Sequence, residues 1–199
     1  MKTGKMQSTI SAQEQFAKIE KPNIERSTFD RSSSYKTTLD AGKLYPIFVE
    51  EALPGDTMDL KATMFGRLST PLKPIMDNMK FDIHFFSVPN RLVWENWEKF
   101  NGQQDNPDDS TNFLIPTITA DGDGFREGEI YDYLGIPTKV GGLEISALPL
   151  RAINLIFNEW YRDQNIQDSL VVPKGDGPDT QGTYQLFDRN KRKDYLVVH

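Results

Sequence analysis

The clearest pattern in the sequence is an alternation of apolar and polar positions over residues 58–68. Met58, Leu60 and Met64 fall on one side of this pattern, while Asp59 and Lys61 fall on the other. Because an extended backbone points successive side chains to opposite faces, a period of two predicts a β-strand with one buried face. A second layer must cover that apolar face.

Further strands are predicted on both sides of this one. The β-favouring residues of 43–50 predict a strand that Pro46 restricts to an edge or a bulge. Residues 81–88 alternate and then become wholly apolar, which predicts a strand buried on both faces at its end. Shorter strands are predicted at 113–119, 169–172, 183–187 and 195–198. Several strands with long loops between them predict a mainly β fold of the β-sandwich kind.

Two segments change to a helical period. Between residues 90 and 100, Val93, Trp97 and Phe100 share one face and Trp94 lies beside them, which predicts a short helix that begins after the cap residue Asn90. We expect this face to bury its rings against the sheet. A longer helix is predicted after residue 146, with a proline in its first turn, and continues to about residue 164. Its apolar positions are Leu150, Ile153, Phe157 and Trp160, and its other positions include Arg151, Asn154, Glu159 and Arg162.

The first forty residues differ from the rest in charge. They hold seven Lys/Arg and five Asp/Glu, whereas residues 41–199 hold sixteen and twenty-four. We therefore divide the chain into an extended amino-terminal arm at 1–40 and a body at 41–199. Arg26 and Arg31 are the arm residues expected nearest any phosphate, and Phe29 is an apolar anchor. An ordinary solvated terminus explains the same composition.

Composition limits the class of protein. The 199 residues include 26 Gly and Pro, and only 37% are hydrophobic, which predicts many turns and loops. The absence of cysteine excludes disulfides, thiolate metal sites and cysteine nucleophiles, and suits folding in a reducing cytoplasm. No apolar run approaches the ~20 residues of a membrane helix, so no membrane partner is expected.

The sequence offers few residues for catalysis or metal binding. The only histidines are His84, within a predicted strand, and His199. A hydrogen-bonded core or interface histidine is the simpler interpretation of His84. Glu95 and Glu98 form a carboxylate pair of the kind that glycosidases use, but solvated helix faces carry the same spacing. Residues 175–179 lack the lysine of a phosphate-binding loop and predict a turn. Calcium ligands in the acidic loop at 101–133 are a weaker hypothesis, on Asp105, Asp108, Asp109, Asp121 and Asp123. We therefore predict no catalytic residues, no metal site and no cofactor.

Short stretches in a fixed order along nearly the whole chain carry a resemblance to a known family. They occupy residues 22–29, 53–57, 70–78, 88–102, 146–152, 158–165 and 174–179. Together they resemble the amino-terminal part of the major capsid protein of microviruses, the small icosahedral single-stranded-DNA bacteriophages, and in particular of their gokushovirus branch.

This resemblance implies a structural protein and not an enzyme. It implies a viral jelly roll with long, partly helical loops and two lateral helices, assembled from identical copies into a closed T=1 icosahedral shell. The implied partners are copies of the chain, other phage structural proteins and, weakly, packaged single-stranded DNA. The implied location is the virion, assembled in the host bacterial cytoplasm. Family members are typically more than twice as long, so the jelly roll is expected to be incomplete here. Residues expected to pack within or between subunits are Phe29, Trp94, Trp97, Phe100, Trp160 and Tyr161.

Two other functions remain open at this point. A free-standing β-sandwich that binds carbohydrate or another ligand would use Trp94, Trp97 and Trp160 as stacking platforms. An acidic hydrolase would use Glu95 and Glu98. Ring placement separates the first of these from a capsid protein, because a sugar site needs exposed rings in a groove, whereas subunit contacts need buried ones.

Overall fold

The computed structural model describes residues 25–189. The chain divides into two units, residues 1–35 and 36–199, which we describe separately. The described part of the first unit, residues 25–35, is exposed and contains neither helix nor strand. The predicted arm before residue 25 and the predicted strand at 195–198 lie outside the described residues.

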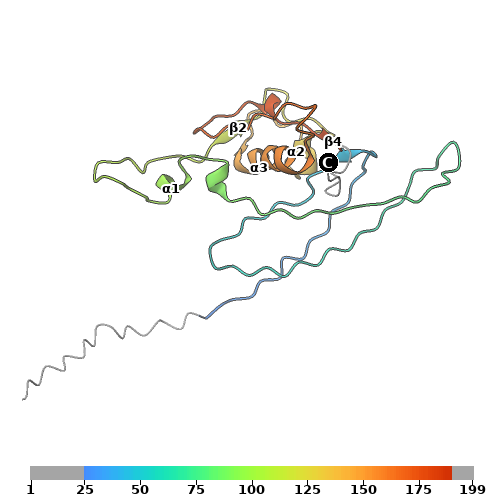
Figure 1. Cartoon of the computed structure of the whole chain (residues 1–199), viewed down its shortest axis with the longest axis horizontal. Coiled ribbons are helices and arrows are strands. Elements are labelled where there is room, and N and C mark those ends of the chain that lie inside the picture. The colour runs from blue at the N-terminus through green and yellow to red at the C-terminus, as the bar shows by residue number, and fades with distance from the viewer. Residues whose placement is uncertain (1–24, 190–199) are drawn as a thin grey trace, which may run out of the picture. The chain divides into compact units, whose positions relative to one another are not determined.

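The second unit holds short helices and strands separated by long irregular segments (Figure 1). Its strands are β1 (Lys43–Leu44), β2 (Thr117–Thr119), β3 (Glu144–Ser146) and β4 (Phe187–Asp188). Its α-helices are α1 (Trp97–Phe100), α2 (Ile130–Tyr133) and α3 (Leu148–Ile156), and α3 continues as a π-helix, η3 (Phe157–Tyr161). The 3-10 turns are η2 (Asn90–Leu92) and η4 (Gln181–Thr183).

The strands form two small antiparallel sheets. In one, β2 pairs with β3 so that Ile118 lies opposite Ile145. In the other, β1 pairs with β4, with Leu44 opposite Phe187. A parallel bridge between Ile118 and Asp179 adds the chain after α3 to the first sheet. These sheets are far smaller than a complete sandwich, because each strand has only two or three residues.

The main core lies between the β2–β3 sheet, α2 and α3. Phe125 and Tyr131 are fully buried and stacked, with ring centroids 4.2 Å apart. The other buried members of this core are Ile118, Ala120, Ile130, Ala147, Leu150 and Tyr184. Helix α2 and strand β3 supply part of it, and neither was predicted from the sequence. Both are too short for their periodicity to stand out.

The long helix was predicted correctly up to Tyr161. Its proline lies in the first turn, and Leu150 and Phe157 are buried as expected. The last turn widens into η3, and Arg162 then turns to extended backbone. The predicted end near residue 164 is therefore a few residues late. Trp160, predicted on the apolar face, is 53% exposed.

The predicted helix over residues 90–100 is broken in two. Turn η2 ends at Leu92 and α1 begins at Trp97. Between them the backbone N–H of Glu95 donates to the carbonyl of Lys174, 3.0 Å away, instead of to a helical carbonyl. Asn90 lies inside η2 and does not cap it, because Pro89 occupies that position.

Three predicted strands are not formed as such. Residues 58–68 and 81–88 contain no strand, and only Lys43–Leu44 of the segment 43–50 pairs with another strand. Figure 1 shows residues 45–85 as an extended trace. A strand needs a neighbour for its backbone N–H and C=O groups, and within residues 25–189 nothing pairs with 58–68.

The region after α3 also differs from prediction. Residues 169–172 form no strand because side-chain amides take their backbone groups. The amide of Asn158 both donates to the Leu170 carbonyl (2.9 Å) and accepts from its N–H (2.8 Å), and Asn154 donates to the Val171 carbonyl (3.0 Å). The predicted strand at 183–187 reduces to the end of η4 and the start of β4. Among the described residues, no helix has the length and apolar character needed to cross a membrane.

Candidate functional site

Among residues 25–189, the most elaborate polar structure is a buried junction around Arg151 of α3. Both side chains of its ion pair are almost inaccessible, with Arg151 at 0% and Asp179 at 3% exposure. Arg151 Nε donates to Asp179 Oδ2 (2.7 Å) and Nη2 donates to Oδ1 (2.6 Å), which is a bidentate pair. Nη1 donates to the carbonyls of Val93 (3.1 Å) and Gly175 (2.9 Å). One guanidinium thus ties α3 to two segments distant in sequence.

Further hydrogen bonds extend this Arg151 junction. The Tyr184 hydroxyl donates to Asp179 Oδ2 at 2.6 Å, and the backbone N–H of Asp179 donates to the Thr117 carbonyl of β2 at 2.8 Å. At the other end of the same turn, Asp176 Oδ1 accepts from Trp94 Nε1 and from Asn96 Nδ2, each at 2.8 Å. The turn at 175–179 therefore joins β2, α3 and the aromatic segment before α1.

The charges of this junction stabilise one another. Burial alone would raise the pKa of Asp179, but hydrogen bonds from Arg151 and Tyr184 together with the Arg151 charge outweigh it, and the pKa lies below its ordinary value. Hydrogen bonds from Asn96 and Trp94 lower the pKa of Asp176. Burial, followed by the bond to Asp179, raises the pKa of Tyr184 well above its usual range. Both aspartates are thus held as carboxylates at neutral pH.

Sequence reasoning missed this junction. It placed Arg151 away from the apolar face of the helix, and it interpreted residues 175–179 only as a turn. The turn is present, but the carboxylates of Asp176 and Asp179 also accept hydrogen bonds from the buried side chains of Trp94 and Arg151. The available signal was an arginine directly after the buried Leu150, in a chain whose acidic turn follows the helix. That signal does not identify the partner of Arg151, because the ion pair forms only when the chain folds.

The predicted aromatic stripe is present in a different form. Val93 and Trp94 are fully buried, whereas Trp97 and Phe100 are partly buried. Trp94 lies 5.3 Å from Phe100 and 6.2 Å from Trp97, between ring centroids. The cluster packs against Leu148 and later residues of α3, and not against a sheet as predicted. A role for Trp94, Trp97 and Phe100 in subunit contacts stays a prediction.

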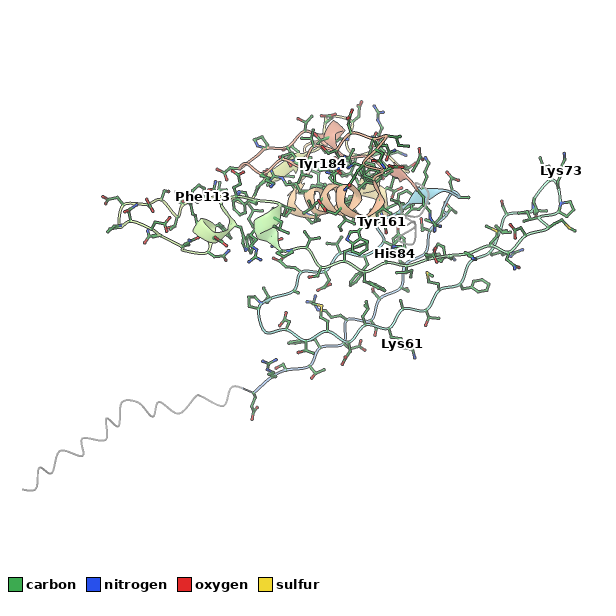
Figure 2. All side chains as sticks on the ribbon, viewed as in Figure 1. Lys61, Lys73, His84, Phe113, Tyr161 and Tyr184 are labelled. Atoms are coloured by element: carbon green, nitrogen blue, oxygen red, sulfur yellow. The ribbon has the colours of Figure 1, made fainter. Side chains whose placement is uncertain are left out.

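A second aromatic group lies at the π-helical end of α3. Figure 2 shows His84 beside Tyr161, and the two rings are stacked with centroids 5.9 Å apart. His84 Nδ1 and the Tyr161 hydroxyl are joined by a hydrogen bond of 2.7 Å. Phe86 packs on Trp160 at 5.6 Å. His84 is thus hydrogen-bonded as predicted, although it is exposed and outside any strand.

The remaining predicted residues lie in the amino-terminal unit. Phe29 is 78% exposed, and Arg26 and Arg31 are exposed as well. Their assignment to subunit contact and DNA contact stays a prediction.

The candidates for metal or acid chemistry are not brought together. Within residues 25–189, no three His, Asp or Glu side chains are arranged to hold a metal ion. The Asp109 carboxylate instead accepts the backbone N–H groups of Asp105 and Asn106, which lowers its pKa and closes the loop. Glu98 lies in α1, whereas Glu95 lies before it, and both are exposed.

In the part of the chain that the structure describes, the most exposed apolar surface lies in residues 51–82, which we call the exposed segment. Every one of its residues is exposed, and Figure 2 shows two of them, Lys61 and Lys73, on the extended trace. Its large apolar side chains include Leu53, Met58, Leu60, Met64, Phe65, Leu68, Leu72, Ile75, Met76, Met79 and Phe81. An apolar surface of this extent is unusual on a monomeric protein and indicates a missing contact.

Comparison with known proteins identifies the family. The family model described as "Capsid protein (F protein)" matches residues 17–198. The chain is 55% identical to the capsid protein VP1 of Bdellovibrio phage phiMH2K over 93% of its length, and 45% identical to that of Chlamydia phage 1 over 92%. It is 32% identical to that of Spiroplasma virus 4 over 79%. These alignments cover 35%, 34% and 31% of the three relatives, so the chain spans about a third of the length of the curated relatives that it matches.

The match at residues 17–198 includes all seven stretches that carry the sequence resemblance. It confirms the predicted family and the assignment to a structural protein. This chain belongs to the microvirus capsid protein F family, together with the VP1 proteins of gokushoviruses.

Proposed function

We propose that the chain is the amino-terminal portion of a coat subunit that builds the closed shell of a small single-stranded-DNA phage. The observation that carries this proposal is the contrast within one unit. Residues around the Arg151 junction are tightly packed, whereas the exposed segment presents alternating apolar side chains with no neighbouring strand among the described residues.

In a jelly roll, strands distant in sequence pair with one another. The exposed segment then supplies strands whose neighbours come from polypeptide beyond the third of the relatives that this chain spans. Residues 58–68 become the strand that their alternation predicts once a neighbouring strand takes up their backbone groups. The body at 41–199 is thus part of a jelly-roll coat domain whose sandwich it does not complete alone.

The proposed partners follow from this role. Copies of the chain are the principal partner, and other phage structural proteins are further ones. The shell is assembled in the host bacterial cytoplasm and the protein resides in the virion. The arm at 1–40 contacts another subunit or the packaged single-stranded DNA, with Arg26 and Arg31 nearest the phosphates.

Self-association of the purified chain tests the proposal. We expect light scattering to report concentration-dependent soluble oligomers or aggregates, and electron microscopy to show no closed shells, because open strand edges beside exposed apolar side chains favour strand addition. Replacing Leu72 and Met76 by serine should reduce the association. Leu114→Ser, at a leucine that is 82% exposed outside the segment, is the control and should leave the association unchanged. A monodisperse monomer at all concentrations contradicts the proposal.

A further inference from the structure

A shallow groove runs between the chain at residues 51–54 and the η2–α1 region. Its volume is about 710 Å³, within the range of small-ligand sites. Trp97 and Pro54 give it apolar walls, and Glu51, Glu98, Asn101 and Gln103 surround them with polar groups. The groove is separate from the Arg151 junction and from the aromatic pair at His84.

The wall of this groove at the η2–α1 region is held in place. The Trp97 ring stacks on Phe100 with centroids 6.0 Å apart and planes 30° apart, and the Trp94 ring is tilted at 59° to it with centroids 6.2 Å apart. Asn101 Nδ2 donates to the Trp97 carbonyl at 2.6 Å, which fixes the amide at the end of α1. Within the described part of the chain, the side chains of Glu51, Glu98 and Gln103 have no hydrogen-bond partner, so their polar atoms are available to a ligand.

The chemistry of the lining selects a class of ligand. An indole ring offers a flat apolar surface, two carboxylates accept hydrogen bonds, and the three amides of Asn90, Asn101 and Gln103 both donate and accept. No lysine or arginine lines the groove, so phosphate, nucleic acid or an acidic sugar would meet two negative charges without compensation. A sugar ring without charge matches this set, because it has an apolar C–H face and several hydroxyl groups around its edge.

We propose that this groove binds a neutral saccharide. One sugar ring lies on Trp97, and its hydroxyl groups bond to Glu51, Glu98 and Gln103. Trp97 lines the groove and can contact a ligand, whereas Trp94 is fully buried and cannot. The activity goes beyond the coat function, and every lining residue of the groove belongs to this chain, with residues 51–54 at the start of the exposed segment.

Binding is measured on the full chain with three trisaccharide probes. These are the trimer of N-acetylglucosamine and maltotriose, which are neutral, and trigalacturonic acid, which is anionic. Saturation-transfer difference NMR and calorimetry report binding without relying on tryptophan emission. We expect saturable binding of a neutral probe with a Kd of roughly 1 mM, and at least tenfold weaker binding of trigalacturonic acid. Absence of saturation by both neutral probes up to about 20 mM overturns the proposal, and so does equal affinity for the anionic probe.

Variants locate the site. Trp97→Ala should abolish binding, whereas Phe65→Ala, which removes an exposed aromatic ring elsewhere, should not. Because Trp97 also contacts Trp94 and Phe100, its replacement can disturb the fold. A second variant therefore tests the site without changing these ring contacts. Glu98→Ala/Gln103→Ala removes two exposed side chains and should weaken binding at least tenfold with an unchanged melting temperature.

The matched control for this double variant is Glu144→Ala/Gln185→Ala, at exposed residues outside the groove. Unchanged affinity in the Glu98/Gln103 variant, or an equal loss in the control, overturns the proposed site. A chain that does not self-associate can still bind the saccharide, and a chain that does not bind it can still self-associate. Failure of one proposal is therefore distinguishable from failure of the other.

Discussion

Replacing Arg151 by methionine should destabilise the chain more than any other single change on its polar groups. The substitution keeps most of the side-chain volume but leaves the Asp179 carboxylate, at 3% exposure, without its bidentate partner. It also removes the donor to the carbonyls of Val93 and Gly175. Removing one partner of a buried ion pair costs about 3–5 kcal/mol.

The assay is urea unfolding followed by circular dichroism. Asp179→Asn should cost a similar amount because it leaves the guanidinium buried and unpaired, whereas Tyr184→Phe removes one hydrogen bond and should cost about 1–2 kcal/mol. The double variant Arg151→Met/Asp179→Leu should lose about 1–3 kcal/mol less than the sum of the single changes, because neither charge is then left alone.

Lys139→Met is the control for this series. Its partner is Glu127 at 2.7 Å, but both side chains are about two-thirds exposed, so the loss should stay below about 1 kcal/mol. The reasoning is refuted if Arg151→Met costs less than about 1 kcal/mol, or if the double variant loses the full sum of the single changes.

Three further predictions concern the aromatic cluster, a turn and acid. Trp94→Ala should lower the free energy of unfolding by about 3–5 kcal/mol in the same assay, because the ring is fully buried. Trp97→Ala should lower it by about 1–2 kcal/mol, because its ring is partly exposed. A larger loss for Trp97→Ala than for Trp94→Ala would contradict the described packing. Gly124→Ala should lower the melting temperature, since Gly124 has φ +78° and an added Cβ would overlap the backbone of Val140, whereas Gly122→Ala has open space and should not. The lowered pKa of Asp179 means that its contribution to stability is complete above the ordinary carboxyl pKa near 4 and is lost as the pH falls through the lower folded-state value. The melting temperature of Asp179→Asn should therefore fall less steeply than that of the parent between about pH 4 and pH 2, and parallel curves would contradict this.

Local signals were sufficient for some elements. The helix at α3 could be predicted because Leu150, Ile153 and Phe157 recur at helical spacing behind a first-turn proline. The strand β2 could also be predicted, although its length could not. Turn signals and periodicity are properties of neighbouring residues, so they persist in a chain that holds only a third of the relatives' length.

Other elements depend on groups far away in sequence. The alternation at residues 58–68 predicts a strand, but no neighbouring strand is present among the described residues. The sequence pattern is therefore present, whereas the β-strand is not formed. Residues 169–172 also look like a strand, but Asn154 and Asn158 take their backbone groups. The pairing of Arg151 with Asp179 joins residues 28 positions apart, and no periodicity predicts it.

The central claim is that the exposed segment awaits strands from the rest of a coat subunit, and hydrogen exchange read by mass spectrometry tests it most directly. The chain is measured alone, at a concentration where it is monomeric, and then with the part of the capsid protein VP1 of Bdellovibrio phage phiMH2K that lies outside the aligned region. We predict fast exchange at residues 58–68 in the chain alone, slow exchange in β2 and α3, and new protection at 58–68 in the mixture. Slow exchange at 58–68 in the isolated monomer, or no added protection in a mixture shown to form a complex, would contradict the account.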